Sequence, residues 1–383
     1  MSVSPLNISI VGGGIMGLTT AWALARDGHR VTVFEQGPIP NPLGSSVDEH
    51  RLIRHPYGPE RGYTRMIAGA YAAWDALWAD LGTAHYAPTG TLVLNRGDPW
   101  TRDTTESLRA EDIPFQEIGP RGVIEGYPLL AADDVRGGVV LDSGGTLFAQ
   151  RIVRHLARYL PSRGVDVETE LHVSKVDPER GRLWLADDLR GDHLVEADLV
   201  IVAAGPWAPR LLPRLRPRVT PSRQAVIYLN PPGDLMPQWL THPMVLDLDL
   251  TSGFYVVPPR AAPGGGVSGL KIGNHRFTLS GDPDRDRVAT GEETHKLLAL
   301  CQRSLRHFEH YTIREAKICF YDVEPHERFI VEQVGARGWV LSGFSGHGFK
   351  FAAVIAEELA RTIRGERAAA DLTGWAAGHL PEG

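Results

Sequence analysis

The strongest constraint on the fold is a glycine-rich turn between a short apolar run and a helical pattern. Residues 7–11 are β-prone and lead directly into Gly12, Gly14 and Gly17, which have the spacing G-x-G-x-x-G. Small apolar residues at helical spacing follow, and residues 30–35 are a second β-prone run that ends in Glu35. This order predicts a βαβ unit that binds a dinucleotide, since a strand is followed by a glycine turn, a helix, a second strand and an acid.

Each part of this unit has a physical role. Gly12 permits the tight turn, Gly14 lets a pyrophosphate approach the backbone, and Gly17 lets helix and strand pack closely. The helix N-terminus, where Ile15 and Met16 lie, offers N–H groups and partial positive charge to phosphates. Glu35 can accept hydrogen bonds from both hydroxyls of an adenosine ribose. The unit alone does not choose between NAD and FAD, and a purely structural glycine turn is the alternative.

The composition narrows the functional class. Apolar residues make up 43% of the chain and charged residues 22%, which is typical of globular proteins. Forty Lys and Arg against forty-six Asp and Glu give a net charge of −6 without any block of like charge, so we expect no nucleic-acid or membrane partner. The apolar stretches are too short to span a bilayer, and no secretory signal is evident. Cys301 and Cys319 are too few for a disulfide framework or a structural zinc site, and we predict no metal site and a cytoplasmic enzyme.

The rest of the chain predicts a mixed α/β fold with a Rossmann-like nucleotide-binding domain and an interleaved domain of mixed or antiparallel sheet. Helices are expected at 66–81, 150–160, 292–309 and before residue 364, and strands at 89–94, 139–141, 197–205 and 339–342. Residues 216–315 alternate in polarity, as in antiparallel sheet. We assign residues 1–85, 146–215 and 316–383 to the nucleotide-binding domain, and residues 86–145 and 216–315 to the substrate domain. Tyr71, Trp74, Leu77 and Trp78 share a helical face that we expect to be core.

Several segments spread over the chain resemble a known family. They are residues 12–17 with Glu35, 44–58, 203–207, 269–275, 317–321 and 343–351. Together they resemble the monomeric sarcosine oxidase and N-methyltryptophan oxidase branch of the glycine/D-amino acid oxidase flavoproteins. The Cys-x-Tyr motif at Cys319 and the Gly-x-Ser-Gly-His-Gly-x-Lys motif from Gly343 to Lys350 are more specific than the first glycines.

The resemblance implies FAD as the cofactor, attached through its 8α-methyl group to Cys319. A thiolate is the nucleophile that such a bond needs, and Lys317 and Arg314 lie close to Cys319 in sequence. An inert core cysteine is the alternative. The remaining cofactor-side positions that the resemblance implies are Ser45, Arg51, Gly205, Trp207, Gly343, Gly346, His347, Gly348 and Lys350.

The resemblance also implies a substrate site. Arg54 and Lys350 match a pair that holds the substrate carboxylate, a task that suits an arginine fork and a lysine point charge. Lys271 matches a lysine over the flavin that promotes the reaction with oxygen, where a fixed cation would stabilise developing negative charge. Arg51 and His275 match positions near flavin and substrate, and Tyr57 and Tyr321 match substrate-side tyrosines. Surface charges and a structural histidine are the alternatives for these residues.

Two departures from the family pattern bear on the substrate. His50 stands where a threonine usually precedes the arginine that matches Arg51. A second substrate-side tyrosine, which the family carries after the position of Gly253, is replaced by Val256 in this sequence. Tyr255 lies one place away, and a longer turn at 258–268 leaves this local alignment open.

These observations predict FAD-dependent oxidation of a secondary amine of an amino acid, with dioxygen reduced to hydrogen peroxide by a monomeric enzyme. The substrate would be sarcosine, another N-methyl amino acid or a cyclic imino acid. The alternatives are a D-amino acid or glycine-type oxidase or dehydrogenase with non-covalent FAD, an NAD-dependent dehydrogenase, and a flavin-binding scaffold without turnover.

Overall fold

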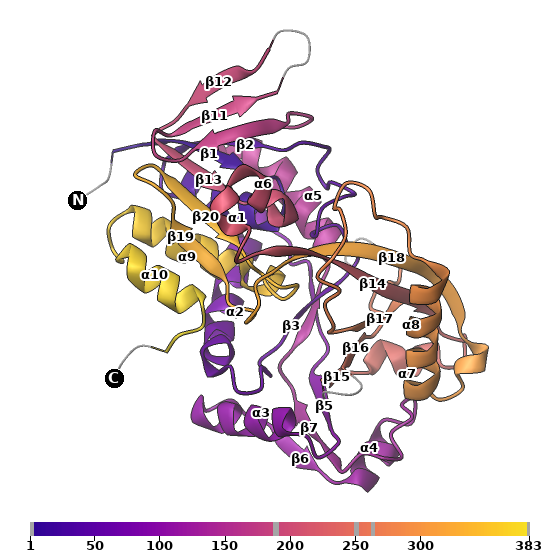
Figure 1. The fold of residues 1–383 in the computed structure, drawn as a ribbon. Coiled ribbons are helices and arrows are strands. Elements are labelled where there is room, and N and C mark those ends of the chain that lie inside the picture. Colours follow the sequence, from indigo (N-terminus) through magenta and orange to yellow (C-terminus); the bar gives the residue numbers. More distant parts are fainter. Residues whose placement is uncertain (1–3, 187–190, 249–252, 262–264, 381–383) are drawn as a thin grey trace.

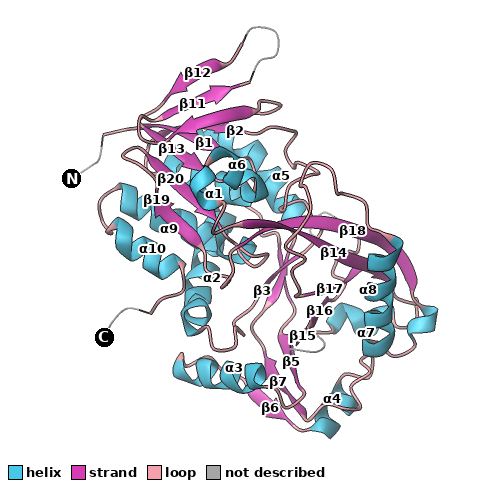
Figure 2. Cartoon of the chain, in the orientation of Figure 1, coloured by secondary structure: helices cyan, strands magenta, loops and turns pink. Residues whose placement is uncertain are grey.

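The first sheet of the molecule contains the predicted βαβ unit. The computed structural model describes residues 4–186, 191–248, 253–261 and 265–380. Six strands lie in the order β19-β20-β13-β1-β2-β9, and neighbouring strands are parallel except for β19 and β20. Their bounds are Asn7–Val11 (β1), Arg30–Phe34 (β2), Asp166–Glu168 (β9), Leu199–Val202 (β13), Ile330–Gln333 (β19) and Gly338–Ser342 (β20). Strands predicted from both ends of the chain therefore meet in one sheet (Figures 1 and 2).

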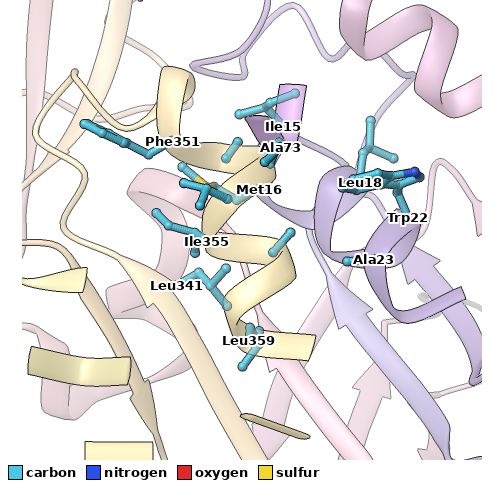
Figure 3. Packing of buried hydrophobic residues seen from close by; sticks show 14 of the residues in the cluster. Ile15, Met16, Leu18, Trp22, Ala23, Ala73, Leu341, Phe351, Ile355 and Leu359 are labelled. Carbon is cyan, nitrogen blue, oxygen red and sulfur yellow. The ribbon is translucent and has the colours of Figure 1, made fainter. Parts of the chain in front are cut away.

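Helices α1 (Ile15–Arg26), α2 (Arg61–Leu81), α5 (Ala149–Tyr159) and α9 (Ala352–Ile363) build the core beside this sheet. Every residue of α1 from Ile15 to Leu24 is buried, which explains its small apolar composition. Figure 3 shows Met16 of α1 lying close to Ile355 of α9. The predicted core face of α2 is confirmed for Trp74, Leu77 and Trp78, which are buried, whereas Tyr71 is half-buried. Helix α2 begins at Arg61, five residues before the predicted start, and ends as predicted at Leu81, where Gly82 follows in the left-handed conformation.

The second large sheet has eight strands in the order β18-β14-β17-β16-β15-β5-β7-β6. Neighbours are antiparallel except for β15 and β5, so the antiparallel prediction for 216–315 is confirmed for the strands of that segment. The bounds are Thr91–Asn95 (β5), Gln116–Ile118 (β6), Gly137–Leu141 (β7), Thr220–Asn230 (β14), Met244–Asp247 (β15), Phe254–Val257 (β16), Leu270–Asn274 (β17) and Thr312–Val323 (β18).

Shorter elements complete the fold. Two three-stranded sheets join β3 (Arg51–Ile53), β8 (Gly145–Leu147) and β4 (Tyr86–Pro88), and β10 (Val173–Asp177), β11 (Arg182–Leu185) and β12 (His193–Glu196). The other helices are α3 (Pro99–Ala110), α4 (Pro120–Gly126), α6 (Ala208–Leu211), α7 (Met236–Thr241), α8 (Gly291–Ser304) and α10 (Ala369–Ala376). Among the helices of the described residues, none is long and apolar enough to cross a membrane.

The long strand pair β14 and β18 brings the two large sheets together. These strands pair along their whole lengths, and Figure 1 shows them running from beside α6 toward α8. At the end of β18, Asp322 accepts a hydrogen bond from the Ser342 hydroxyl of β20. Residues 45–54, 319–322 and 343–350 are thereby gathered where the sheets meet.

Candidate active site

A pocket lies at the carboxyl ends of β1 and β13, where ligands bind in parallel α/β sheets. We call it the glycine-loop pocket. It is lined by Gly14, Ile15, Met16, Gly44, Ser45, Ser46, Arg51, residues 203–207, Tyr321, Asp322, Leu341, Phe344, Gly346, Gly348 and Phe349. Most of the predicted cofactor-side residues are therefore together. Gly12, Gly17, Glu35, Gly343 and Cys319 lie beside this pocket rather than in its lining.

The three glycines of the G-x-G-x-x-G motif differ in how much room the fold leaves beside them. Gly12 has φ +114°, and a Cβ there would come within 2.4 Å of the Ala203 carbonyl oxygen. A Cβ on Gly17 would lie 1.9 Å from the Gly12 carbonyl oxygen, so α1 could not pack on β1. A Cβ on Gly14 would meet only the Ser46 hydroxyl, at 3.4 Å, which leaves this backbone open toward the pocket.

The adjoining polar groups also fit FAD. The Glu35 carboxylate, buried at the end of β2, accepts a hydrogen bond from the Gly13 N–H at 2.7 Å and so lies beside the glycine turn. The Ser46 hydroxyl accepts from the Ile15 N–H at 3.0 Å and fixes the entry to α1. An apolar groove with a helix N-terminus and a buried acid at one end matches the chemistry of a flavin dinucleotide.

A second pocket adjoins the first. We call it the cation pocket, because Arg51, Arg54, Lys271 and Lys350 line it. Its other lining residues are His50, Leu52, Leu246, Leu248, Tyr255, Val257, Asn274, His275, Tyr321, Gly346, His347 and Phe349. Arg51, Tyr321, Gly346 and Phe349 line both pockets, so the two are continuous.

Arg54 and Lys350 converge on the cation pocket as predicted. Lys350 is buried in the short turn just before α9, where its Nζ donates to the Tyr57 hydroxyl at 2.9 Å and the His347 carbonyl at 2.7 Å. The Arg54 guanidinium lies over the Tyr57 ring, 4.4 Å from its centre, and its buried Nη1 has no hydrogen-bond partner. Burial lowers the pKa of both cations, and nearby Arg54 lowers that of Lys350 further. Within the described residues neither has a carboxylate partner, so the pocket is suited to an anion.

Lys271 is also in the cation pocket, but it has a partner that the sequence analysis missed. Its Nζ donates to the carboxylate of Asp48, which also accepts from Arg51 and from the Tyr228 hydroxyl. Asp48 lies inside the segment 44–58 that carries the resemblance. An acid between Ser46 and Arg51 was therefore the feature of the sequence that could have pointed to a partner for Lys271. His50, the first departure, is buried, and burial lowers its pKa to about 3, so this imidazole is neutral.

Cys319 is buried, and burial raises the pKa of its thiol, whereas Arg51 lowers it. The Arg51 Nη2 lies 3.8 Å from Sγ and also donates to the Ser45 carbonyl at 2.6 Å. Arg314, which is close to Cys319 in sequence, pairs instead with Glu49. The cations that lower the pKa of the thiol are Arg51, Lys271 and Arg287, which are distant in sequence.

Tyr255, the residue before Val256, lies in the cation pocket. Side chains alternate along β16, so Phe254 and Val256 pack in the core while Tyr255 lies in the cation pocket. The Lys271 Nζ lies 5.9 Å from the centre of the Tyr255 ring. Tyr255, one place from Val256, therefore presents a tyrosine ring to this pocket. The longer turn at 258–268 includes residues 262–264, which lie outside the described residues.

The remaining predicted residues lie at the edges of the site. His275 is partly exposed at the edge of the cation pocket and pairs with Glu327, with 3.1 Å between Nε2 and Oε2. His347 is buried and its Nδ1 lies 3.4 Å from the Tyr57 hydroxyl; burial holds its pKa well below its usual value. The Trp207 indole donates to Asp284 at 2.8 Å, and Gly205, with φ +49°, begins the turn before it.

Comparison with known proteins agrees with this geometry. The family model described as "DAO: FAD dependent oxidoreductase" matches residues 7–362. The chain is 25% identical to monomeric sarcosine oxidase of Bacillus sp. (strain B-0618) over 93% of its length and 91% of that protein. It is 24% identical to N-methyl-L-tryptophan oxidase of Yersinia pestis (strain Pestoides F) over 92% of its length and 93% of that protein.

Solved structures show the same fold. NikD, an amino acid oxidase of nikkomycin biosynthesis, superposes in its Tyr258Phe mutant form with a TM-score of 0.79 at 18% identity, over 100% of this chain and 99% of that one. L-proline dehydrogenase from P. horikoshii gives a TM-score of 0.79 at 20% identity over 98% and 99%. With its glycine turn, its two joined pockets and these matches, the chain belongs to the DAO family of FAD-dependent oxidoreductases.

Proposed function

We propose that the protein oxidises the secondary amine of a small amino acid, such as sarcosine, another N-methyl amino acid or a cyclic imino acid. The observation that carries this proposal is the pair Arg54 and Lys350, two cations with no carboxylate at ion-pair distance among the described residues, in a pocket continuous with the glycine-loop pocket. A substrate carboxylate would supply the missing negative charge. Binding it there places the rest of the substrate among Tyr255, Tyr321 and Phe349.

The overall reaction is R–CH2–NH–R′ + O2 → R–CH=N–R′ + H2O2. Two electrons and two hydrogens leave the substrate and reduce dioxygen, and the imine then takes up water in solution. FAD, held in the glycine-loop pocket, would supply the two-electron acceptor between the substrate and dioxygen. Arg54 and Lys350 fix the substrate, Lys271 stabilises negative charge that develops on oxygen, and His275 and Glu327 lie at the edge of the pocket.

We further propose that Cys319 carries the flavin through a thioether to its 8α carbon. In forming this bond the thiol and the methyl group lose one hydrogen each, and dioxygen takes both as hydrogen peroxide. Arg51 supports the proposal because its guanidinium contacts Sγ and partly offsets the burial that raises the pKa of the thiol. That the enzyme works as a cytoplasmic monomer with no other partner than its small substrate and oxygen stays a prediction from the sequence.

The first test is the visible spectrum of the purified protein, followed by acid precipitation. We expect yellow that stays with the pellet and maps to the peptide containing Cys319, and peroxide release in a screen of N-methyl and cyclic imino acids. Yellow in the supernatant would favour a D-amino acid or glycine-type enzyme with non-covalent FAD. A yellow protein that no amine reduces would favour a flavin-binding scaffold.

The role of Lys271 has its own test, because oxygen reacts in a step separate from amine oxidation. In the Lys271→Met variant we expect reoxidation by oxygen to slow at least a hundredfold, as for a lost electrostatic donor, while anaerobic reduction by the amine changes less than tenfold. Stopped-flow absorbance of the flavin separates the two half-reactions. Equal slowing of both would contradict this role.

A further inference from the structure

A buried acid lies against the lysine of the cation pocket. The side chain of Asp48 is 4% exposed and accepts hydrogen bonds from Lys271, Arg51 and the Tyr228 hydroxyl. The backbone N–H of Glu49 donates to the same carboxylate at 3.0 Å. Burial alone would raise the pKa of Asp48, but Lys271 and Arg51 outweigh burial and lower it, so this carboxylate is ionised.

Lys271 depends on this carboxylate for its charge. The residue is 2% exposed, and among the described residues its Nζ donates, besides Asp48, to the His50 carbonyl at 3.4 Å. Burial, with a smaller contribution from Arg51, lowers the pKa of Lys271 to about 8, although Asp48 opposes both effects. An ammonium group in a dry site with a second cation beside it loses its proton readily unless an anion compensates.

The other groups that face Lys271 are neutral or positive. They come from every element packed against it: His50 and Arg51 from the 44–54 segment, Tyr228 from β14, Tyr255 from β16, and Cys319 and Tyr321 from β18. Burial lowers the pKa of His50 to about 3 and raises the pKa of Tyr228, Tyr255, Cys319 and Tyr321. Within the described part of the chain, Asp48 is the one negative charge in contact with Lys271.

We propose that Asp48 is a positioning residue for the oxygen reaction, because it keeps the Lys271 ammonium charged and aimed into the cation pocket. This inference rests on the proposed function, in which Lys271 stabilises charge on oxygen. Transfer of an electron pair to dioxygen creates negative charge that an ammonium stabilises and a neutral amine does not. Asp48 thus keeps the positive charge on Lys271 itself at pH values where Lys271 without this partner would be neutral.

The test compares Asp48→Asn, which keeps the side-chain shape and removes the charge, with the unmodified holoenzyme. Each protein is reduced photochemically without substrate and mixed with oxygenated buffer between pH 6 and 10. We expect the rate to fall above about pH 8 in the unmodified enzyme, and the fall to move at least one pH unit lower in Asp48→Asn, about a tenfold loss of rate at pH 8.5. An unchanged pH profile would overturn the proposal.

The flavin reduction potential, measured by dye equilibration, gives a second readout that does not depend on turnover. At low pH, Asp48→Asn keeps both cations and loses the anion, so its potential should lie above that of the unmodified enzyme. The two potentials should converge once Lys271 of the variant has lost its proton. Identical potentials at every pH would mean that Asp48 has only a structural role.

Glu49→Gln is the matched control. Glu49 is the next residue, but its carboxylate contacts Arg314 and the Gly269 N–H and not Lys271, so both profiles should stay unchanged. If Asp48→Asn does not fold, Asp48→Ser removes the same charge and leaves room for water. Because the reduction is photochemical, failure to find an oxidised amine would count against the proposed function and leave the role of Asp48 testable.

Discussion

At the scale of single residues, the site is dominated by positive charge that the protein only partly compensates. Asp48 balances one charge of Lys271 and Arg51, whereas Arg54 and Lys350 have no acid in contact among the described residues. Two like charges held together in a poorly solvated pocket are costly in the free enzyme. A carboxylate ligand relieves this repulsion, so the unfavourable arrangement supplies binding energy and selectivity for an acid.

The first prediction follows from this charge balance. In Arg54→Met, the affinity for a carboxylate substrate should fall about 10- to 100-fold, as expected for a lost charge-assisted hydrogen bond of about 1.5–3 kcal/mol. The affinity for the same amine without its carboxylate should change little. Both are measured by titrating the flavin absorbance. Arg154→Met, at an exposed position of α5, is the control, and equal losses for acid and amine would show that Arg54 does not bind the carboxylate.

Sequence reasoning found the cations but not their surroundings. Arg54 and Lys350 stand in motifs, so their meeting in one pocket could be predicted without knowing the path of the chain between them. Tyr255 could not be placed, because one residue of register decides whether a side chain faces the core or the pocket. Arg287 and Lys271 act on Cys319 from other strands and loops, a kind of proximity that sequence neighbours such as Lys317 do not reveal.

At the scale of elements, strand and helix types were predictable where periodicity is strong, and their ends were less so. Helix α2 extends to Arg61 because its first turn packs on the end of the chain: a Cβ on Gly62 would lie 1.8 Å from the Gly378 carbonyl oxygen. No local pattern announces such a contact. The βαβ unit was predictable because its glycine spacing, its two β-prone runs and its acid all lie within one short segment, although the contact of Gly12 with Ala203 comes from outside the unit.

The second prediction separates two of those glycines. Gly17→Ala should destabilise the apoprotein, because the new Cβ would overlap the Gly12 carbonyl, whereas Gly14→Ala should leave the apoprotein stability within about 0.5 kcal/mol. Gly14→Ala should instead weaken FAD binding, since the methyl group occupies the side of the turn that faces the pocket. Urea unfolding of the apoproteins and FAD titration measure the two effects. Similar behaviour of the two variants would mean that Gly14 does not approach the cofactor.

At the scale of the whole molecule, the site exists because two sheets meet. The glycine-loop pocket takes residues from the six-stranded sheet, and the cation pocket takes Lys271 and Tyr255 from the eight-stranded sheet. That the two ends of the chain share a sheet was predictable from two strand–glycine loop units. The division into two domains stays a proposal. The pairing of β14 with β18, which brings the two large sheets together, could not be predicted from the sequence, because it joins strands that are far apart along the chain.

The third prediction concerns the junction of the sheets, where Asp322 at the end of β18 accepts a hydrogen bond from Ser342 of β20 at 3.1 Å. Burial raises the pKa of Asp322 from 3.8 to about 6. The folded state therefore favours the protonated acid, and this contribution is complete below pH 3.8 and is lost as the pH rises through 6. Two pKa units correspond to up to about 3 kcal/mol. The Asp322→Asn side chain stays neutral, so the free energy of unfolding of this variant should increase relative to that of the unmodified protein as the pH rises from 4 to 8.

Urea unfolding at pH 4, 6 and 8 measures this difference in the free energy of unfolding between Asp322→Asn and the unmodified protein. The control is Asp142→Asn, which changes an exposed acid and should shift the free energy of unfolding equally at the three pH values. Asp98→Asn is unsuitable, because the Asp98 carboxylate caps α3. A constant difference between Asp322→Asn and the unmodified protein would mean that Asp322 is ionised throughout. In that case the contact of β18 with β20 would be held by a charged group, and the junction beside the glycine-loop pocket would carry a negative charge that a bound flavin must tolerate.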